Sequence, residues 1–92
     1  MEVTDPHQVT LRRLRMRSMR RGIKEMDLIL SAYAEERLAE LDGPTLALYD
    51  EMLSENDQDL YRWVSGQEDA PERYAALIGD IRTVSLSRAK GE

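Results

Sequence analysis

The stretch from Ile23 to Leu41 constrains the fold most, because its apolar side chains recur at steps of three and four residues. This spacing places apolar side chains on one face of an α-helix and leaves charged ones, such as Glu35 and Glu40, on the other. No stretch of the sequence alternates polar and apolar residues with the period of two that is typical of a β-strand. We therefore predict an all-α fold whose central helix covers residues 23–41.

Helix caps and helix breakers divide the rest of the chain. Asp5 before Pro6 predicts the start of a first helix over residues 6–20, and Gly22 predicts its end in a conformation with φ > 0. Three further helices are predicted behind Asp42 or Gly43, behind Asn56 or Asp57, and behind Asp69. The expected architecture is a five-helix bundle in a single domain (1–92), with a less ordered lead (1–10) and tail (88–92).

Charge is distributed unevenly along the chain. Residues 1–24 hold seven of the thirteen basic side chains and carry a net charge of +5, whereas residues 25–92 carry −10. Such a division is typical of a solvated basic face stabilised by an acidic body, and it can also steer a docking partner. Both interpretations remain open from the sequence.

The chain is poor in residues that catalyse reactions or bind metals. It contains no cysteine, which excludes disulfides, thiolate catalysis and cysteine-based metal sites. Its one histidine, His7, falls in the first turn of a helix, where an ordinary exposed residue is the simpler interpretation. The carboxylate clusters at 35–36 and 57–59 lack the Glu/His spacing of a helix-borne metal site. We predict no metal and no enzymatic activity.

The arginine-rich first helix could in principle approach a phosphate backbone. The strongly acidic remainder and the lack of aromatic residues among the arginines argue against nucleic acid, and the helix lacks the Trp and Phe of a membrane-inserting face. No apolar run is long enough to cross a membrane, and no secretory h-region is present at the N-terminus. We expect a soluble protein of the bacterial cytoplasm that binds no nucleic acid.

A polarised corner is predicted at residues 21–25, where the basic segment meets the acidic one. Arg21 and Glu25 would offer charge-assisted hydrogen bonds there, and Gly22 would allow a partner backbone to come close. The simpler alternative is a helix junction with solvated charges. A second candidate is Tyr61, which lies off the apolar face of its helix and is expected to be exposed to a partner.

Three segments resemble the SdhE family of flavinylation factors: residues 20–27 (RRGIKEMD), 49–53 (YDEML) and 57–63 (DQDLYRW). The resemblance extends from about Leu11 to Val84. The RGxxE motif is short, but its combination with D-x-D-L-x-x-W in a helical chain of this length is specific. Residues 3–10 and the tail after Ser87 fall outside the match.

The resemblance implies a five-helix protein that binds the flavoprotein subunit of succinate dehydrogenase, and often of fumarate reductase, and promotes covalent attachment of FAD to it. It implies no stably bound cofactor, and we expect a monomer when the protein is free. The alternative is a generic helical interaction module whose basic helix docks on an acidic partner. The partner-binding residues carried over are Arg21, Gly22 and Glu25, with Arg20 and Asp27 as frequent neighbours and Arg17 and Tyr61 as further candidates.

Overall fold

The computed structural model describes residues 5–89, which form five α-helices and one short 3₁₀ helix. These are α1 (Pro6–Arg17), α2 (Lys24–Arg37), η1 (Leu38–Glu40), α3 (Gly43–Met52), α4 (Asp57–Val64) and α5 (Glu72–Ala89). No strand occurs within residues 5–89, so the prediction of an all-α five-helix fold is confirmed. Of the expected lead and tail, residues 1–4 and 90–92 lie outside the described part, and residues 6–10 form the start of α1.

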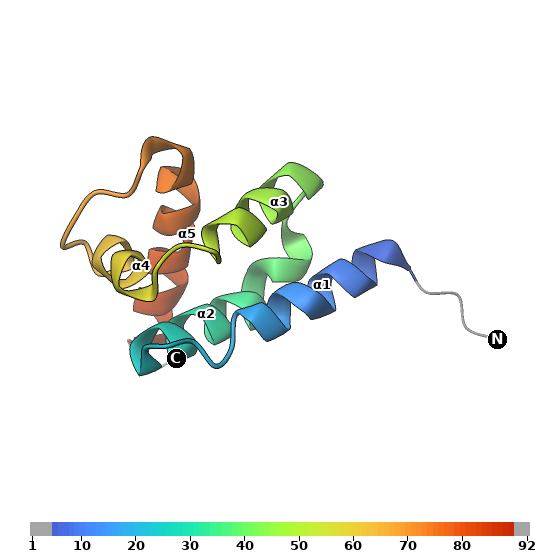
Figure 1. Cartoon of the computed structure of the whole chain (residues 1–92), viewed down its shortest axis with the longest axis horizontal. Coiled ribbons are helices and arrows are strands. Elements are labelled where there is room, and N and C mark those ends of the chain that lie inside the picture. Colours follow the sequence, from blue (N-terminus) through green and yellow to red (C-terminus); the bar gives the residue numbers. More distant parts are fainter. Residues whose placement is uncertain (1–4, 90–92) are drawn as a thin grey trace.

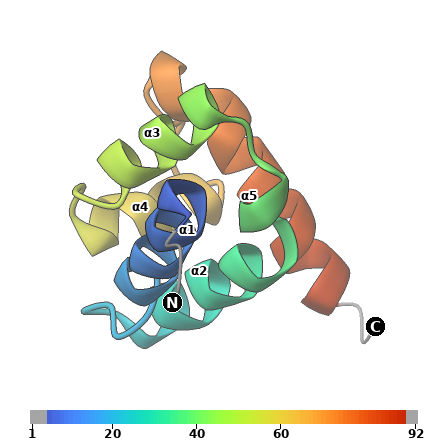
Figure 2. The same ribbon diagram turned by 90° about the vertical axis from the view of Figure 1, so that its right-hand side faces the viewer.

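Helix α2 occupies the centre of the bundle, as its broad apolar face predicts. Helices α1 and α2 lie side by side with opposite directions (Figure 1), and α2 also packs against α4 and α5. In Figure 2, α5 extends along one side of the molecule from α3 to α2, and it contacts both. None of the helices in residues 5–89 is long and apolar enough to cross a membrane.

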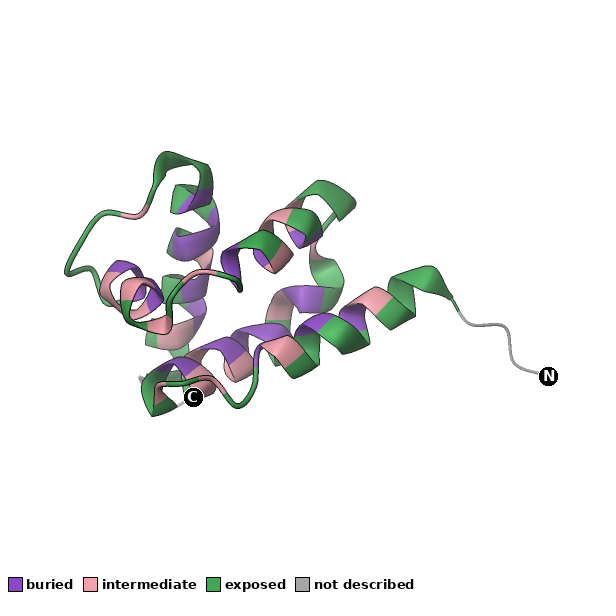
Figure 3. Cartoon of the chain, viewed as in Figure 1, coloured by how far each residue is buried: buried purple, intermediate pink, exposed green. Residues whose placement is uncertain are grey.

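The core is built from inward faces of all five helices, seen as the buried stripes in Figure 3. Tyr33 and Tyr49 are fully buried, with ring centroids 5.7 Å apart, and Trp63 packs 6.0 Å from the ring of Tyr74. Aromatic pairs at such distances combine a large buried area with favourable ring geometry. Helix α1 contributes little to this core, since Leu11 and Leu14 are its only buried residues.

Three predicted N-caps are confirmed. Asp5 accepts a hydrogen bond from the His7 N–H, Asp42 from the Thr45 N–H and Asn56 from the Gln58 N–H, at 3.0, 2.9 and 2.8 Å respectively. The predicted cap at Asp69 is wrong. Helix α5 begins at Glu72, directly after Pro71, so Asp69 lies too far ahead to satisfy its first turn.

Helix α1 ends at Arg17, three residues earlier than predicted. The backbone N–H of Ser18 still bonds to Leu14 O, but the chain then leaves the helix and Arg20 adopts a φ of +54°. Among residues 5–89, Gly66 is the only glycine with positive φ, so the prediction of φ > 0 at Gly22 is wrong. The left-handed residue that turns the chain is Arg20.

Candidate partner-binding site at the α1–α2 corner

Residues 18–23 connect α1 to α2, and together with the first turn of α2 (residues 24–27) they are called the corner below. Its first residue, Ser18, is fully buried. The Ser18 hydroxyl donates to Leu14 O at 2.8 Å and lies 2.6 Å from the Tyr49 hydroxyl. Burial raises the pKa of Tyr49 to about 12, although the hydrogen bond with Ser18 opposes this. The phenol therefore stays neutral at physiological pH and ties the start of the corner to α3.

The side chain of Arg21 points into the fold. The side chain is 12% exposed, and its guanidinium forms an ion pair with Asp57 at the start of α4, with Nε to Oδ1 at 2.8 Å. Its remaining donors reach two backbone carbonyls, Arg17 O at 2.8 Å and Leu53 O at 2.9 Å. Charge-assisted bonds of this kind are stronger than neutral ones. Arg21 therefore joins the ends of α1 and α3 to α4.

Gly22 uses the other oxygen of the same carboxylate. Its backbone N–H donates to Asp57 Oδ2 at 2.7 Å. A Cβ atom added to Gly22 would lie 3.2 Å from that oxygen, closer than an ordinary van der Waals contact. A glycine is thus favoured here by the close approach of Asp57.

The opposite side of the corner is closed by Asp27 on α2. Its Oδ1 accepts from the Arg20 backbone N–H at 3.0 Å and from the Ser31 hydroxyl at 3.3 Å. The first bond holds Arg20 in its left-handed conformation and leaves its side chain exposed. Glu25, in the first turn of α2, is also exposed, where the helix dipole favours a carboxylate.

Arg17 lies beside the corner in a second polar contact, between α1 and α3. Arg17 and Arg13 both pair with Asp50, the latter through two bonds of 3.2 and 2.9 Å, and Arg17 also reaches the Ser54 hydroxyl. The hydrogen bond from Arg13, aided by the charges of both arginines, lowers the pKa of Asp50 in spite of partial burial. Asp50 is therefore a charged anchor for α1.

A basic surface surrounds the corner. It consists of exposed cations on α1 or in the corner. None of these cations makes an ion pair within residues 5–89, and three exposed apolar side chains are counted with them. Its cations are Arg12, Arg15, Arg20 and Lys24, and its apolar members are Met16, Met19 and Leu28. Exposed apolar groups rimmed by charges are typical of interaction surfaces.

A groove of about 300 Å³ lies between α1 and α2 within this region. Its lining residues are Arg15, Met19, Ser31, Ala34 and Glu35. The apolar side chain of Met19, 47% exposed, borders it together with groups of both charges. The arrangement suits the side chains of a protein partner better than a single small ion.

Five of the seven residues predicted from the sequence meet in the corner, and Arg17 lies next to it. Tyr61 does not join them. It is half-buried on α4, against the expectation of an exposed side chain, and it lines a separate cavity of about 220 Å³ with Ile29 and Leu86.

The roles of Asp57 and Asp50 do not follow from the sequence pattern alone. The sequence offers Asn56 or Asp57 as the cap of α4; Asn56 does the capping, and Asp57 instead binds Arg21 and Gly22 of the corner. One signal was available in the sequence: both aspartates lie in segments that resemble the SdhE family.

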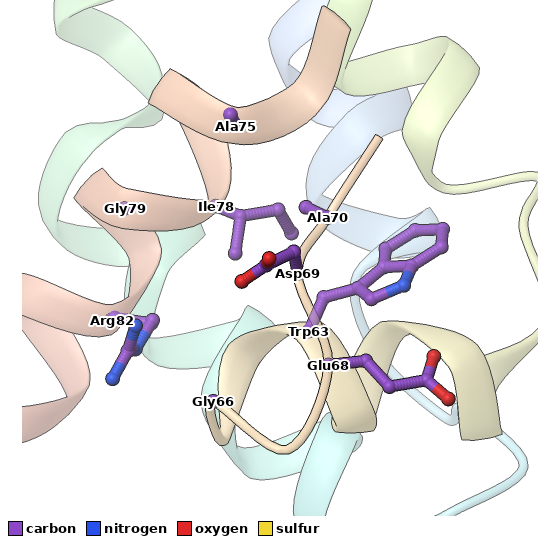
Figure 4. Close-up of a pocket in the computed structure, with 9 residues that line it drawn as sticks. All are labelled: Trp63, Gly66, Glu68, Asp69, Ala70, Ala75, Ile78, Gly79 and Arg82. Carbon is purple, nitrogen blue, oxygen red and sulfur yellow. The ribbon is translucent and has the colours of Figure 1, made fainter. Parts of the chain in front are cut away.

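A further cavity, of about 310 Å³, lies between α4 and α5 away from the corner (Figure 4). Trp63 and Ile78 border it, with the charged residues Glu68, Asp69 and Arg82 around them. Within residues 5–89, no three or more His, Cys, Asp or Glu side chains are grouped so that they could hold a metal ion.

Comparison of the sequence with known proteins places the chain in a class, the succinate dehydrogenase assembly factors. Residues 12–85 match the Sdh5 family, described as flavinator of succinate dehydrogenase, and the chain belongs to this family. The resemblance stated from the sequence is thereby confirmed.

Several relatives share most of the described chain. Succinate dehydrogenase assembly factor 2-B, mitochondrial, of Drosophila mojavensis is 35% identical over 88 residues, covering 94% of this chain and 56% of that protein. Succinate dehydrogenase assembly factor 2, mitochondrial, of Schizosaccharomyces japonicus is 44% identical over 78 residues, covering 83% and 54%. The protein of the same name from Schizosaccharomyces pombe is 41% identical over 64 residues, covering 70% and 46%.

The chain spans about half the length of these relatives. They are named as mitochondrial proteins of fungi and flies, so the prediction of a bacterial cytoplasmic location is wrong.

Proposed function

We propose that this chain binds the flavoprotein subunit of succinate dehydrogenase and promotes covalent attachment of FAD to that subunit. The family description and the names of the relatives support this proposal. The observation that carries it is the corner, where Arg20 and Glu25 are exposed on a backbone held by Asp57 and Asp27. Charged groups held in a fixed geometry lose little entropy when a partner binds.

The proposed mechanism requires no residue of this chain to take part in the covalent step. The flavin couples to a histidine of the partner, so the helper acts by stabilising the partner geometry in which the two meet. The only histidine of this chain, His7, lies on the exposed first turn of α1, outside the corner. The role of the corner is therefore to bind and orient the flavoprotein.

FAD is proposed to remain on the partner throughout. The cavity of Figure 4 is bordered by the carboxylates of Glu68 and Asp69, which would repel the pyrophosphate of FAD. Arg82 is the one cation that lines it. The same partner-binding surface would serve a fumarate reductase flavoprotein if its shape at the flavin site is similar.

The proposal is tested by co-expressing the chain with the flavoprotein subunit and measuring covalent flavin fluorescence in a denaturing gel. Glu25→Ala should strongly reduce the signal, because a charge-assisted contact to a partner is worth about 2 kcal/mol or more. The same change at an exposed first turn should alter the free energy of unfolding by only a few tenths of a kcal/mol. Glu72→Ala, in the first turn of α5, is the matched control and should flavinylate normally.

Binding is measured separately by size-exclusion chromatography with light scattering. We expect a monomer alone and a one-to-one heterodimer with the flavoprotein. Binding without any gain in covalent flavin would support the generic interaction module instead. Normal flavinylation by Glu25→Ala would mean that the corner is only a helix junction.

A further inference from the structure

We propose that Asp57 is a positioning residue for the corner, and that Arg21 acts on the partner only through Asp57. Arg20, Lys24 and Glu25 are then the charged groups of the corner that contact the partner. This inference rests on the proposed function and deepens it, because it separates the residues that shape the corner from those that touch the flavoprotein.

The geometry at Asp57 uses both oxygens of its carboxylate. Oδ1 accepts from Arg21, with Nε and Nη2 both at 2.8 Å, and Oδ2 accepts from the Gly22 N–H at 2.7 Å. A carboxylate is the side-chain group that accepts hydrogen bonds on two oxygens at once. An asparagine offers one oxygen, so it can serve Arg21 or Gly22 but not both. The site is therefore specific for a carboxylate.

Burial keeps Arg21 away from a partner. The side chains of Arg21 and Asp57 are 12% and 18% exposed, and the other donors of Arg21 are bound to Arg17 O and Leu53 O. A partner carboxylate could reach the guanidinium only by displacing Asp57, which would leave a partly buried charge without its partner. Exchanging one ion pair for another gains little binding free energy, so Arg21 stays paired with Asp57 and supports the corner from inside.

The position of Asp57 couples the corner to the core. It is the first residue of α4, where the helix dipole favours a negative charge. Three residues further on, Leu60 is fully buried, and Trp63 packs on Tyr74 of α5. The backbone at Gly22 is thus fixed relative to the core through α4, and so are the exposed side chains on either side of it.

The first arm of the test uses the free protein. Hydrogen exchange of the Gly22 amide, followed by NMR, should be slow in the wild type and at least about tenfold faster in Asp57→Ala, which removes both acceptor oxygens. Asp59→Asn is the matched control: it removes another first-turn carboxylate of α4, one that pairs with Arg62 and does not touch the corner. Thermal melts by circular dichroism verify that each variant is folded. Unchanged Gly22 exchange in Asp57→Ala would overturn the positioning role.

The second arm is a double-mutant cycle on affinity for the flavoprotein subunit. Arg21→Ala, Asp57→Ala and the double variant should each bind about tenfold more weakly, with no further loss on combining them, because they remove one unit. Glu25→Ala should add its own loss to that of Asp57→Ala. If Arg21→Ala weakens binding further in the Asp57→Ala background, Arg21 contacts the partner and the proposal is wrong.

The two arms separate the possible failures. A wild-type chain that does not bind the flavoprotein overturns the proposed function, and with it the division of partner contacts. Gly22 exchange still decides the positioning role in that case, since it needs no partner.

Discussion

At position 22, close packing against Asp57 favours glycine, and a positive φ plays no part. Gly22→Ala adds a Cβ 3.2 Å from an Asp57 oxygen that is itself held by Arg21, while it also reduces the entropy of the unfolded chain. We expect the free energy of unfolding to change by less than about 1 kcal/mol. Gly22→Arg should fold with a similar melting temperature and lose most flavinylation, because its side chain fills the space in front of the corner.

Denaturant melts and the covalent-flavin assay check this prediction together. Gly43→Ala, on a glycine whose added Cβ would meet nothing within 4 Å, is the control. A Gly22→Arg protein that flavinylates as well as the wild type would show that no partner atom approaches this position.

The members of the corner could be predicted from the sequence because they are consecutive, and a contiguous motif needs no tertiary information. The ion pair between Arg21 and Asp57 could not. The chain has eighteen acidic residues, and the packing angles of three helices decide which of them meets a given arginine. The left-handed conformation of Arg20 could not be predicted from the sequence either, since it depends on a hydrogen bond to Asp27, seven residues away.

At the scale of elements, α1 is attached to the bundle largely by polar contacts. Only Leu11 and Leu14 are buried along the helix, while Arg13 and Arg17 both bind Asp50 on α3. The narrow apolar stripe of this helix predicts its shallow burial. What the sequence does not show is that part of its cationic surface faces inward onto a carboxylate.

The attachment of α1 should weaken in acid. The pKa of Asp50 is lowered in the fold, first by the hydrogen bond from Arg13, so its carboxylate stabilises the folded state above its ordinary pKa of about 4. That stability is lost as the pH falls through the lower pKa of the folded state. Asp50→Asn should therefore cost about 1 kcal/mol at pH 7, a modest value because the side chain is 31% exposed, and less at pH 2 to 3.

Urea melts across this pH range measure the difference. Glu51→Gln, the next residue on α3, removes an exposed pair with Arg73 and should cost only a few tenths of a kcal/mol. An Asp50→Asn protein whose stability falls in acid as steeply as that of the wild type would contradict the argument.

The helix pattern itself was largely predictable, because apolar periodicity and N-caps are local. The errors lie at boundaries, and one of them is the end of α2 at Arg37, four residues before the predicted Leu41, with η1 following it. Helix α1 stops early where Arg20 turns left-handed with its backbone N–H bonded to Asp27, and α5 begins at Glu72, behind Pro71 and not behind Asp69. The end of α1 thus depends on a hydrogen bond between residues seven positions apart, which apolar periodicity does not show.

At the scale of the whole molecule, the uneven charge is only partly neutralised internally. Arg13, Arg17 and Arg21 bind carboxylates of the acidic segment, whereas the cations of the basic surface make no ion pair within residues 5–89. We expect these cations to steer a negatively charged partner, so the association rate should fall several-fold as salt is raised, with little effect on dissociation.

Stopped-flow binding of the double variant Arg12→Gln/Arg15→Gln tests this prediction. Its association should be slower than that of the wild type at low salt and should approach it at high salt. Arg82→Gln neutralises an exposed arginine of α5, away from the basic surface, and should bind like the wild type. An association rate that does not change with salt concentration would show that the basic surface is only solvated and does not steer the partner.

The contact of Trp63 with Tyr74 has a practical consequence. Trp63 is the only tryptophan of the chain, so intrinsic emission reports the local environment of a single indole between α4 and α5. Because Trp63 is only 9% exposed, its emission should be blue-shifted while α4 stays docked and should move to longer wavelength when α4 detaches. A change confined to the corner leaves this spectrum as it is, whereas a change that propagates through Asp57 into α4 alters it, without any added label.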